Sequence, residues 1–219
     1  MPHQSNSIIK PLTIAILSVI AFMALAHYIF YSDLTQIQQT IFNFMSHLRN
    51  TQLNTLMLAL TKTANPLPII IVTLIISVLL FLKHHKREAF FSLLTIITTA
   101  GTNSILKHVF VRERPSFDSL IHETGFSFPS GHSMISFALA LLLSYLSFYF
   151  LSKRWLAFLV SLLCFSYAIL VGFSRVYISV HYAGDVLGGW LAATAVFSIL
   201  LCFFNLIALP IKKDLSYRR

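Results

Sequence analysis

Three short clusters of polar residues interrupt a chain that is otherwise mostly apolar. In chain order they are Lys107 with Arg114-Pro115, the run Pro129-Ser130-Gly131-His132, and Ser174-Arg175 followed by His181 and Asp185. The clusters supply cations, histidines and one carboxylate. These residue types bind a phosphate group and can transfer it through a histidine.

The cations Lys107, Arg114 and Arg175 suit a single phosphoryl group. A phosphate carries up to two negative charges, and the arginine fork matches two of its oxygens at once. The Ser130 hydroxyl and the backbone N–H groups near Gly131 add donors at the expected start of a helix, where anions are favoured. We predict that these residues bind the phosphate of the substrate.

His181 and Asp185 are four residues apart, so on a helix they would share one face. The carboxylate can then accept the N–H of one ring nitrogen and leave the other nitrogen free to attack phosphorus. Attack would give a phosphohistidine that water later hydrolyses. His132, from another cluster, is the candidate general acid, which protonates the departing oxygen and afterwards activates the water.

Other charged residues have plainer interpretations. We expect Arg49, Lys62 and Arg112 to anchor the ends of helices in the headgroup region. Two-metal phosphatases need several carboxylates and histidines that converge. The acidic residues here are scattered; they are Asp33, Glu88, Glu113, Asp118, Glu123, Asp185 and Asp214. We therefore predict a reaction that uses no metal and no other cofactor.

The order and spacing of the clusters resemble the type 2 phosphatidic acid phosphatase family. The matching patterns are Lys-x6-Arg-Pro, Pro-Ser-Gly-His and Ser-Arg-x5-His-x3-Asp, and every motif position is filled. The resemblance covers about residues 89–209. It implies a membrane lipid phosphatase, in a family that includes bacterial phosphatidylglycerophosphatases and undecaprenyl-diphosphate phosphatases and that shares its site with vanadium haloperoxidases.

The elements that must position the clusters are membrane-spanning helices. The chain of 219 residues is 57% hydrophobic with a mean hydropathy of +0.78, more than a soluble surface tolerates. Apolar runs of the roughly 20 residues that cross a bilayer predict six spans. They lie at residues 12–31, 66–82, 89–111, 134–151, 156–173 and 186–209. We expect an all-α integral membrane protein with one domain, residues 1–219, whose motif-bearing core is about 89–209.

Two shorter segments between the first and second predicted spans are amphipathic or apolar. Residues 34–47 have apolar side chains at helical spacing with polar residues between them, which favours a helix in the membrane interface over a polar loop. Residues 53–61 are apolar and precede Asn65 and two prolines. We predict a short surface helix there, followed by a break.

The distribution of Lys and Arg predicts the orientation, because cytoplasmic loops are enriched in these residues. With the N-terminus inside, ten of the 16 fall in cytoplasmic segments. They are Lys10, Lys83, Lys86, Arg87, Lys153, Arg154, Lys212, Lys213, Arg218 and Arg219. Both termini are then cytoplasmic, and all three clusters lie at the outer face of the cell membrane.

The sequence therefore predicts a phosphatase that acts at the periplasmic or exterior face on a lipid phosphate or diphosphate. Undecaprenyl diphosphate and phosphatidylglycerophosphate are the leading substrates, and a lipid A phosphate is the alternative. The formal charge of +9 is also compatible with nucleic acid. Basic loops are the default in membrane proteins, so the expected partners are the lipid substrate and the membrane, without nucleic acid.

Three rival functions differ in class. A transporter would carry charges near mid-membrane, whereas the charged motif residues gather at one face. A haloperoxidase-like enzyme would use the same anion pocket, but a site beside lipid argues against it. An inactive lipid-binding protein would not need His132, His181 and Asp185 together.

Overall fold

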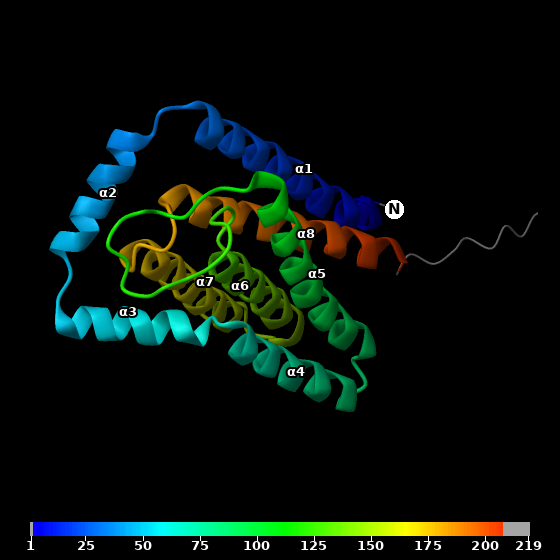
Figure 1. Cartoon of the computed structure of the whole chain (residues 1–219). Coiled ribbons are helices and arrows are strands. Elements are labelled where there is room, and N and C mark those ends of the chain that lie inside the picture. The colour runs from blue at the N-terminus through cyan, green and yellow to red at the C-terminus, as the bar shows by residue number, and fades with distance from the viewer. Residues whose placement is uncertain (1, 208–219) are drawn as a thin grey trace, which may run out of the picture.

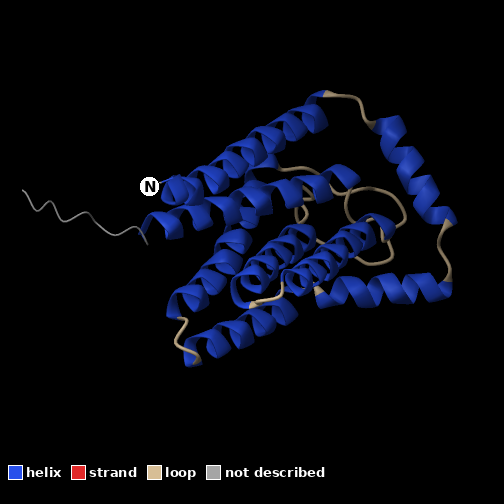
Figure 2. Ribbon diagram, turned by 180° about the vertical axis from the view of Figure 1, so that it is seen from behind, coloured by secondary structure: helices blue, strands red, loops and turns tan. Residues whose placement is uncertain are grey.

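The computed structural model describes residues 2–207. Within that range the chain forms eight helices and no strand (Figure 1, Figure 2). They are α1 (Pro2–Tyr31), α2 (Thr35–His47), α3 (Thr51–Thr63), α4 (Pro66–Leu82), α5 (Lys86–Phe110), α6 (Gly131–Phe150), α7 (Arg154–Tyr177) and α8 (Ala183–Ile207). The prediction of an all-α protein is confirmed. The last two residues of the sixth predicted span, and the basic residues after them, lie outside the described range.

Among the described residues, five helices are long and apolar enough to cross a membrane. These are the Ile8–Tyr31 part of α1, and α5, α6, α7 and α8. α3 and α4 are long and apolar enough when they are taken together, and their axes are bent by 49° at the break between them. When this pair is counted as one broken span, residues 2–207 contain six candidate spans, the number predicted from the sequence.

The break between α3 and α4 follows from the local sequence. Asn65 has an extended backbone, and Pro66 and Pro68 occupy the first turn of α4. Proline lacks an N–H group and fits the first turn of a helix, so the sequence favours a new helix that begins at Pro66. α3 begins with a side-chain cap, because Asn50 accepts a hydrogen bond from the N–H of Leu53 at 2.9 Å.

α6 lies in the middle of the bundle, where it packs against α5, α7 and α8, and α1 packs along α8. Small residues of α8 let the segment before α6 approach closely. A Cβ atom on Gly188 would lie 2.5 Å from the ring of Phe128, and one on Gly189 would lie 2.8 Å from the carbonyl oxygen of Ser130. The backbone around the second motif therefore rests directly on α8.

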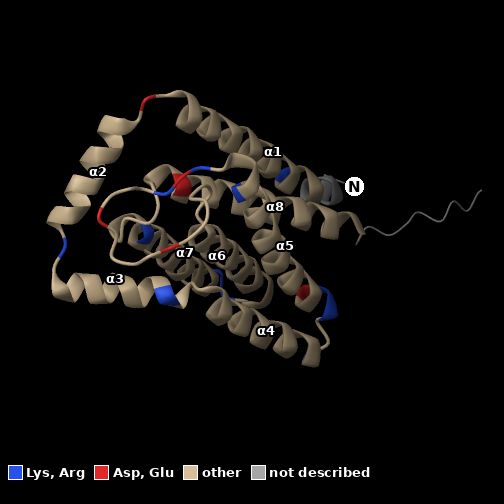
Figure 3. Ribbon diagram, in the orientation of Figure 1, with Lys and Arg blue, Asp and Glu red and all other residues tan. Residues whose placement is uncertain are grey.

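The outer surface of the bundle matches a lipid environment. Large apolar side chains on the outer faces of α1, α4 and α7 are exposed. Charged residues gather toward the two ends of the bundle and leave the middles of the helices mostly uncharged (Figure 3). This is the distribution expected of helices that cross hydrocarbon.

α2 lies across one end of the bundle, and α3 runs from there back toward α4, on the side where the loop of residues 111–130 lies (Figure 1). The ring of Phe42 on α2 stacks on Phe117 of this loop with centroids 4.2 Å apart, and meets the edge of Tyr182 at 5.7 Å. The helices predicted at 34–47 and 53–61 are thus confirmed as α2 and α3. They frame the end of the bundle where the three motifs meet.

Candidate active site

A cavity of about 360 Å³ brings residues of all three motifs together. It lies among the start of α4, the C-terminal half of α5 and the first turn of α6, and the loop of residues 111–130 contributes to its wall. Its lining includes the predicted site residues Lys107, Arg114, Gly131, His132 and His181. Since these residues come from distant parts of the chain, the fold creates the site.

The other predicted site residues lie behind the cavity wall. Ser130, Arg175 and Asp185 are each 0% exposed. The Ser130 hydroxyl accepts a hydrogen bond from the hydroxyl of Ser133 at 3.0 Å. The backbone N–H of Ser130 donates to the carbonyl oxygen of Asp185 at 2.9 Å. The second motif is therefore tied to the third through the backbone.

His181 has one ring nitrogen beside Asp185 and the other beside Arg114. Nδ1 lies 3.4 Å from Oδ2 of Asp185, and Nε2 lies 3.4 Å from a terminal guanidinium nitrogen of Arg114. The expectation that His181 and Asp185 share the face of one helix is wrong. His181 precedes α8 and Asp185 lies in its first turn, so the turn that begins the helix makes the contact.

Burial keeps His181 uncharged near neutral pH. It lowers the pKa of His181 to about 4, although the hydrogen bond and the charge of Asp185 act in the opposite direction. With the proton on Nδ1, beside the carboxylate, a lone pair is left on Nε2 at the cavity. This is the protonation state that a nucleophilic histidine needs.

The prediction that Arg112 anchors in the headgroup region is wrong, because its side chain turns into the protein. Its Nη1 atom pairs with Oδ1 of Asp185 at 2.5 Å, and its guanidinium lies 4.1 Å from the ring centre of Tyr182. The other oxygen of Asp185 accepts the backbone N–H of Tyr182 at 2.9 Å. A buried carboxylate needs a charged partner, which explains why Arg112 turns inward.

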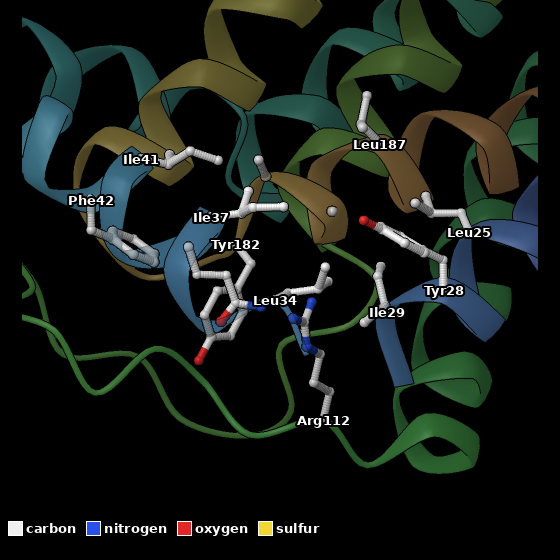
Figure 4. Close-up of a pocket in the computed structure, with 13 residues that line it drawn as sticks. Leu25, Tyr28, Ile29, Leu34, Ile37, Ile41, Phe42, Arg112, Tyr182 and Leu187 are labelled. Carbon is white, nitrogen blue, oxygen red and sulfur yellow. The ribbon is translucent and has the colours of Figure 1, made fainter. Parts of the chain in front are cut away.

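Arg112 and Tyr182 also line a mostly apolar pocket of about 200 Å³. Figure 4 shows Arg112 and Tyr182 on one side of the pocket, with Ile29 of α1 and Ile37 of α2 among the apolar side chains around it. Asp185 is fully buried and does not line this pocket, so only the Arg112 side of the ion pair faces it.

Arg49 also has a structural role that its sequence position did not predict. From the connection between α2 and α3 it donates to the hydroxyl of Ser179 at 2.6 Å and to the carbonyl oxygen of Tyr177 at 3.1 Å. It also donates to the carbonyl oxygen of Asp118 at 2.9 Å. Arg49 therefore ties α2 and α3 to the segment that leads to His181.

Glu123 is a site residue that sequence reasoning missed. Its carboxylate lies between two predicted phosphate ligands, with Oε2 3.2 Å from Arg114 and Oε1 in contact with Arg175. Burial alone would raise the pKa of Glu123, but Arg175 and then Arg114 hold it below its ordinary value. A charged carboxylate therefore occupies the place where a phosphate would meet these cations.

Carbonyl groups direct the two cations that line the cavity. Lys107 donates to the carbonyl oxygen of Phe126 at 2.6 Å. Arg114 donates to the carbonyl oxygens of Gly125 and Val180, each at 3.0 Å. Gly125 has a φ of +75°, a conformation that favours glycine. The loop and the segment before His181 thus fix the guanidinium in the cavity wall.

Two asparagines support the second motif, and neither was predicted as a site residue. Nε2 of His132 lies 2.8 Å from Oδ1 of Asn65, at the break between α3 and α4. The amide nitrogen of Asn103 on α5 donates to the carbonyl oxygen of Pro129 at 3.1 Å. Both α4 and α5 therefore contact the segment that carries His132.

The positive charge facing the cavity comes from protein side chains. Lys107 and Arg114 both line it. Across residues 2–207, no group of three or more His, Cys, Asp and Glu side chains is placed to hold a metal ion.

Comparisons with known proteins agree with the family resemblance that the motifs indicated. The sequence profile of the PAP2 superfamily matches residues 88–207. Phosphatidylglycerophosphatase B of Bacillus subtilis is 33% identical over 159 residues, which cover 71% of this chain and 77% of that enzyme. An undecaprenyl-diphosphatase of Sulfolobus acidocaldarius is 29% identical over 159 residues, which cover 69% of this chain and 70% of that enzyme.

Solved structures show the same architecture. The transmembrane PAP2-type phosphatidylglycerolphosphate phosphatase of Bacillus subtilis superposes with a TM-score of 0.80 and 27% identity, over 90% of this chain and 98% of that one. LpxE of Aquifex aeolicus has a similar fold, with a TM-score of 0.61 and 22% identity, over 75% of this chain and 94% of that one. The family inferred from the motifs is confirmed: this chain belongs to the PAP2 superfamily and is a membrane lipid phosphatase.

Proposed function

We propose that this phosphatase transfers the phosphate of its lipid substrate to Nε2 of His181. The observation that carries the proposal is the position of this nitrogen. His181 lines the cavity with Nε2 3.4 Å from Arg114, while Asp185 lies beside the opposite nitrogen. Arg114 can only donate, so its N–H points at the lone pair of Nε2. A phosphate bound by Arg114 and Lys107 would draw this N–H away and bring phosphorus within reach of the lone pair.

The first step forms the phosphohistidine. The lone pair of Nε2 forms an N–P bond while the bond between phosphorus and the lipid oxygen breaks. In the free enzyme, burial and then the charge of Arg175 disfavour the protonated form of His132, so the negative charge of the bound phosphate must favour protonation before His132 can act as an acid. His132 then gives a proton to that oxygen, so the product leaves as an alcohol, or as a monophosphate when the substrate is a diphosphate. Asp185 stabilises the positive charge that His181 then carries.

The second step returns the enzyme to its starting state. A water oxygen attacks phosphorus while neutral His132 accepts one of the water protons. The N–P bond breaks, its electron pair returns to Nε2 of His181, and inorganic phosphate leaves. His132 is then protonated again and His181 is neutral.

Fixed cations and donors would stabilise the charge on the phosphoryl oxygens. Lys107, Arg114 and Arg175 carry the positive charge, and Ser130 with the backbone N–H groups near Gly131 completes the predicted binding set. These groups supply the charge that a divalent ion provides in other phosphatases, so we expect activity to persist in the presence of a chelator. Loss of activity that magnesium or zinc restores would contradict a metal-independent reaction.

The substrate class rests on the two enzyme relatives. We favour phosphatidylglycerophosphate and undecaprenyl diphosphate, because the matched relatives are named for reactions of these lipids. A lipid A phosphate is the alternative. In each case the phosphate would lie in the cavity at the end of the bundle while the hydrocarbon chains stay in the bilayer.

The decisive experiment measures phosphate release from a panel of purified lipid phosphates by the wild type and by His181→Ala. We expect the wild type to turn over at least one of the favoured lipids, and the variant to be inactive on all of them. Short soluble phosphates should show a much lower kcat/KM than their lipid counterparts. Equal turnover of glycerol phosphate and its lipid form would contradict a lipid-specific site.

We also propose that residues 1–219 form one membrane-embedded domain with both termini in the cytoplasm and the cavity at the outer face. The support is the distribution of Lys and Arg. In a variant without Cys164 and Cys202, an impermeant thiol reagent applied to intact cells should label Ser119→Cys, in an exposed part of the loop. Labelling of Lys86→Cys instead would show that the orientation is the reverse of the proposed one.

A further inference from the structure

Asn65 makes a direct contact with the candidate general acid. Its side-chain Oδ1 lies 2.8 Å from Nε2 of His132. The residues on both sides of it, Ala64 and Pro66, line the cavity. The break in the second span therefore brings an amide group to the rim of the site, opposite the first turn of α6.

The side chain of Asn65 is not used as a helix cap, although its position is that of the N-cap of α4. An asparagine at this position normally accepts a hydrogen bond from the N–H of the second or third helical residue. Here the third residue is Pro68, which has no N–H, and the side chain of Asn65 makes no capping hydrogen bond. Its amide is therefore free to bind His132.

We infer that Asn65 is a positioning residue that fixes the tautomer and the ring orientation of His132. The inference rests on the proposed role of His132 as general acid and base. An amide oxygen can only accept a hydrogen bond, so the proton of this contact belongs to Nε2 of His132. Nδ1 is then the nitrogen that exchanges a proton with the substrate.

The contact is compatible with both halves of the reaction. In the first step the proton on Nδ1 moves to the lipid oxygen, and the electron pair of the broken N–H bond stays on Nδ1. In the second step Nδ1 takes a proton from the attacking water. The N–H group on Nε2 stays bonded to Asn65 throughout, so Asn65 holds His132 in place and does not itself react.

The test uses two substrates that depend differently on an acid. A lipid phosphate has an alkoxide leaving group that must be protonated, whereas nitrophenyl phosphate releases a stabilised anion. Rapid-mixing measurements of the first step give one rate constant for the lipid phosphate and one for nitrophenyl phosphate. The ratio of these two rate constants does not depend on the fraction of enzyme that is folded. His132→Ala should lower the ratio of lipid to nitrophenyl rate by about 10²- to 10⁴-fold. Asn65→Ala should lower the same ratio by about tenfold, the effect of one hydrogen bond.

Two further variants separate positioning from folding. Asn65→Asp keeps an oxygen acceptor and should restore most of the ratio. Asn50→Ala removes the side-chain cap of the neighbouring helix α3 and should leave the ratio unchanged. A normal ratio in Asn65→Ala beside a lowered ratio in His132→Ala would overturn the inference and leave the proposed mechanism intact. A normal ratio in His132→Ala itself would overturn the acid role of His132, and with it the inference.

Discussion

Glu123 binds two cations that the substrate phosphate needs, so removing its charge should strengthen the binding of phosphate-like anions. For a phosphate to contact Arg114 and Arg175 together, the carboxylate of Glu123 must first leave them. Vanadate and inorganic phosphate are suitable probes, because both present oxygens to the same cations. Glu123→Gln keeps the size of the side chain and removes the competing charge.

The size of the effect follows from the contacts. Oε2 lies 3.2 Å from Arg114, and the side chain of Glu123 is 24% exposed, so solvent screens part of the attraction. A hydrogen bond to a charged group contributes about 1.5–3 kcal/mol. At the lower value, release of Glu123 costs about 1.5 kcal/mol, which corresponds to about tenfold in affinity. We expect Glu123→Gln to lower the inhibition constant of vanadate about tenfold.

A second effect of the same substitution appears without ligand. Arg175 is 0% exposed and would lose its carboxylate partner, and an unpaired buried charge destabilises a fold. The Tm of Glu123→Gln should therefore fall, and vanadate should raise it by more than it raises the Tm of the wild type. Tryptophan fluorescence in detergent follows both transitions.

The matched control is Glu113→Gln, an exposed residue of the same loop, which should leave both the inhibition constant and the Tm unchanged. If Glu123→Gln bound vanadate more weakly than the wild type, the reasoning would be refuted. Glu123 would then help to bind the anion, and would not compete with it.

Three further predictions concern the support of His181. Arg112→Ala leaves the buried carboxylate of Asp185 without its charged partner, so it should destabilise the protein by about 3–5 kcal/mol, as thermal unfolding would measure. In steady-state kinetics the substitution should reduce kcat by a larger factor than it changes KM. Because burial depresses the pKa of His181 from 6.5 to about 4, the unfolded chain binds this proton first as the pH falls. The stability of the wild type relative to His181→Ala should therefore be constant above pH 7 and decrease between pH 6.5 and 4, as unfolding at a series of pH values would show. Gly189→Ala would place a Cβ 2.8 Å from a carbonyl oxygen of the second motif and should abolish phosphate release, whereas Gly101→Ala meets nothing within 4 Å and should retain it.

Much of the fold and the lining of the cavity could be predicted from the sequence. Runs of apolar residues mark the spans because hydrocarbon accepts few other segments. The motif spacing identified Lys107, Arg114, Gly131, His132 and His181, all of which line one cavity. The sequence did not show where α8 begins, and for this reason the helical geometry expected for His181 and Asp185 was wrong.

The unpredicted site residues depend on how irregular segments run in space. Arg112 and its partner Asp185 are 73 residues apart, and Glu123 and Arg175 are 52 apart. Arg112 and Glu123 both belong to the loop of residues 111–130, where no helical period relates sequence to direction. Asn65 was recognised as part of a helix break, but the bend that turns its amide toward His132 depends on tertiary packing.

Because α3 bends away from α4 by 49°, only α4 of the broken second span runs along the bundle, and its length has a consequence for the thickness of the surrounding bilayer. α4 has 17 residues and so extends about 26 Å, less than the roughly 30 Å of a typical hydrocarbon core. A short hydrophobic segment is accommodated when the adjacent lipids thin. Lipid headgroups beside α4 would then lie deeper than elsewhere, level with the cavity rim at Pro66. We therefore expect turnover in reconstituted vesicles to fall as the acyl chains of the host lipid are lengthened, because a thicker bilayer holds the substrate phosphate above the site.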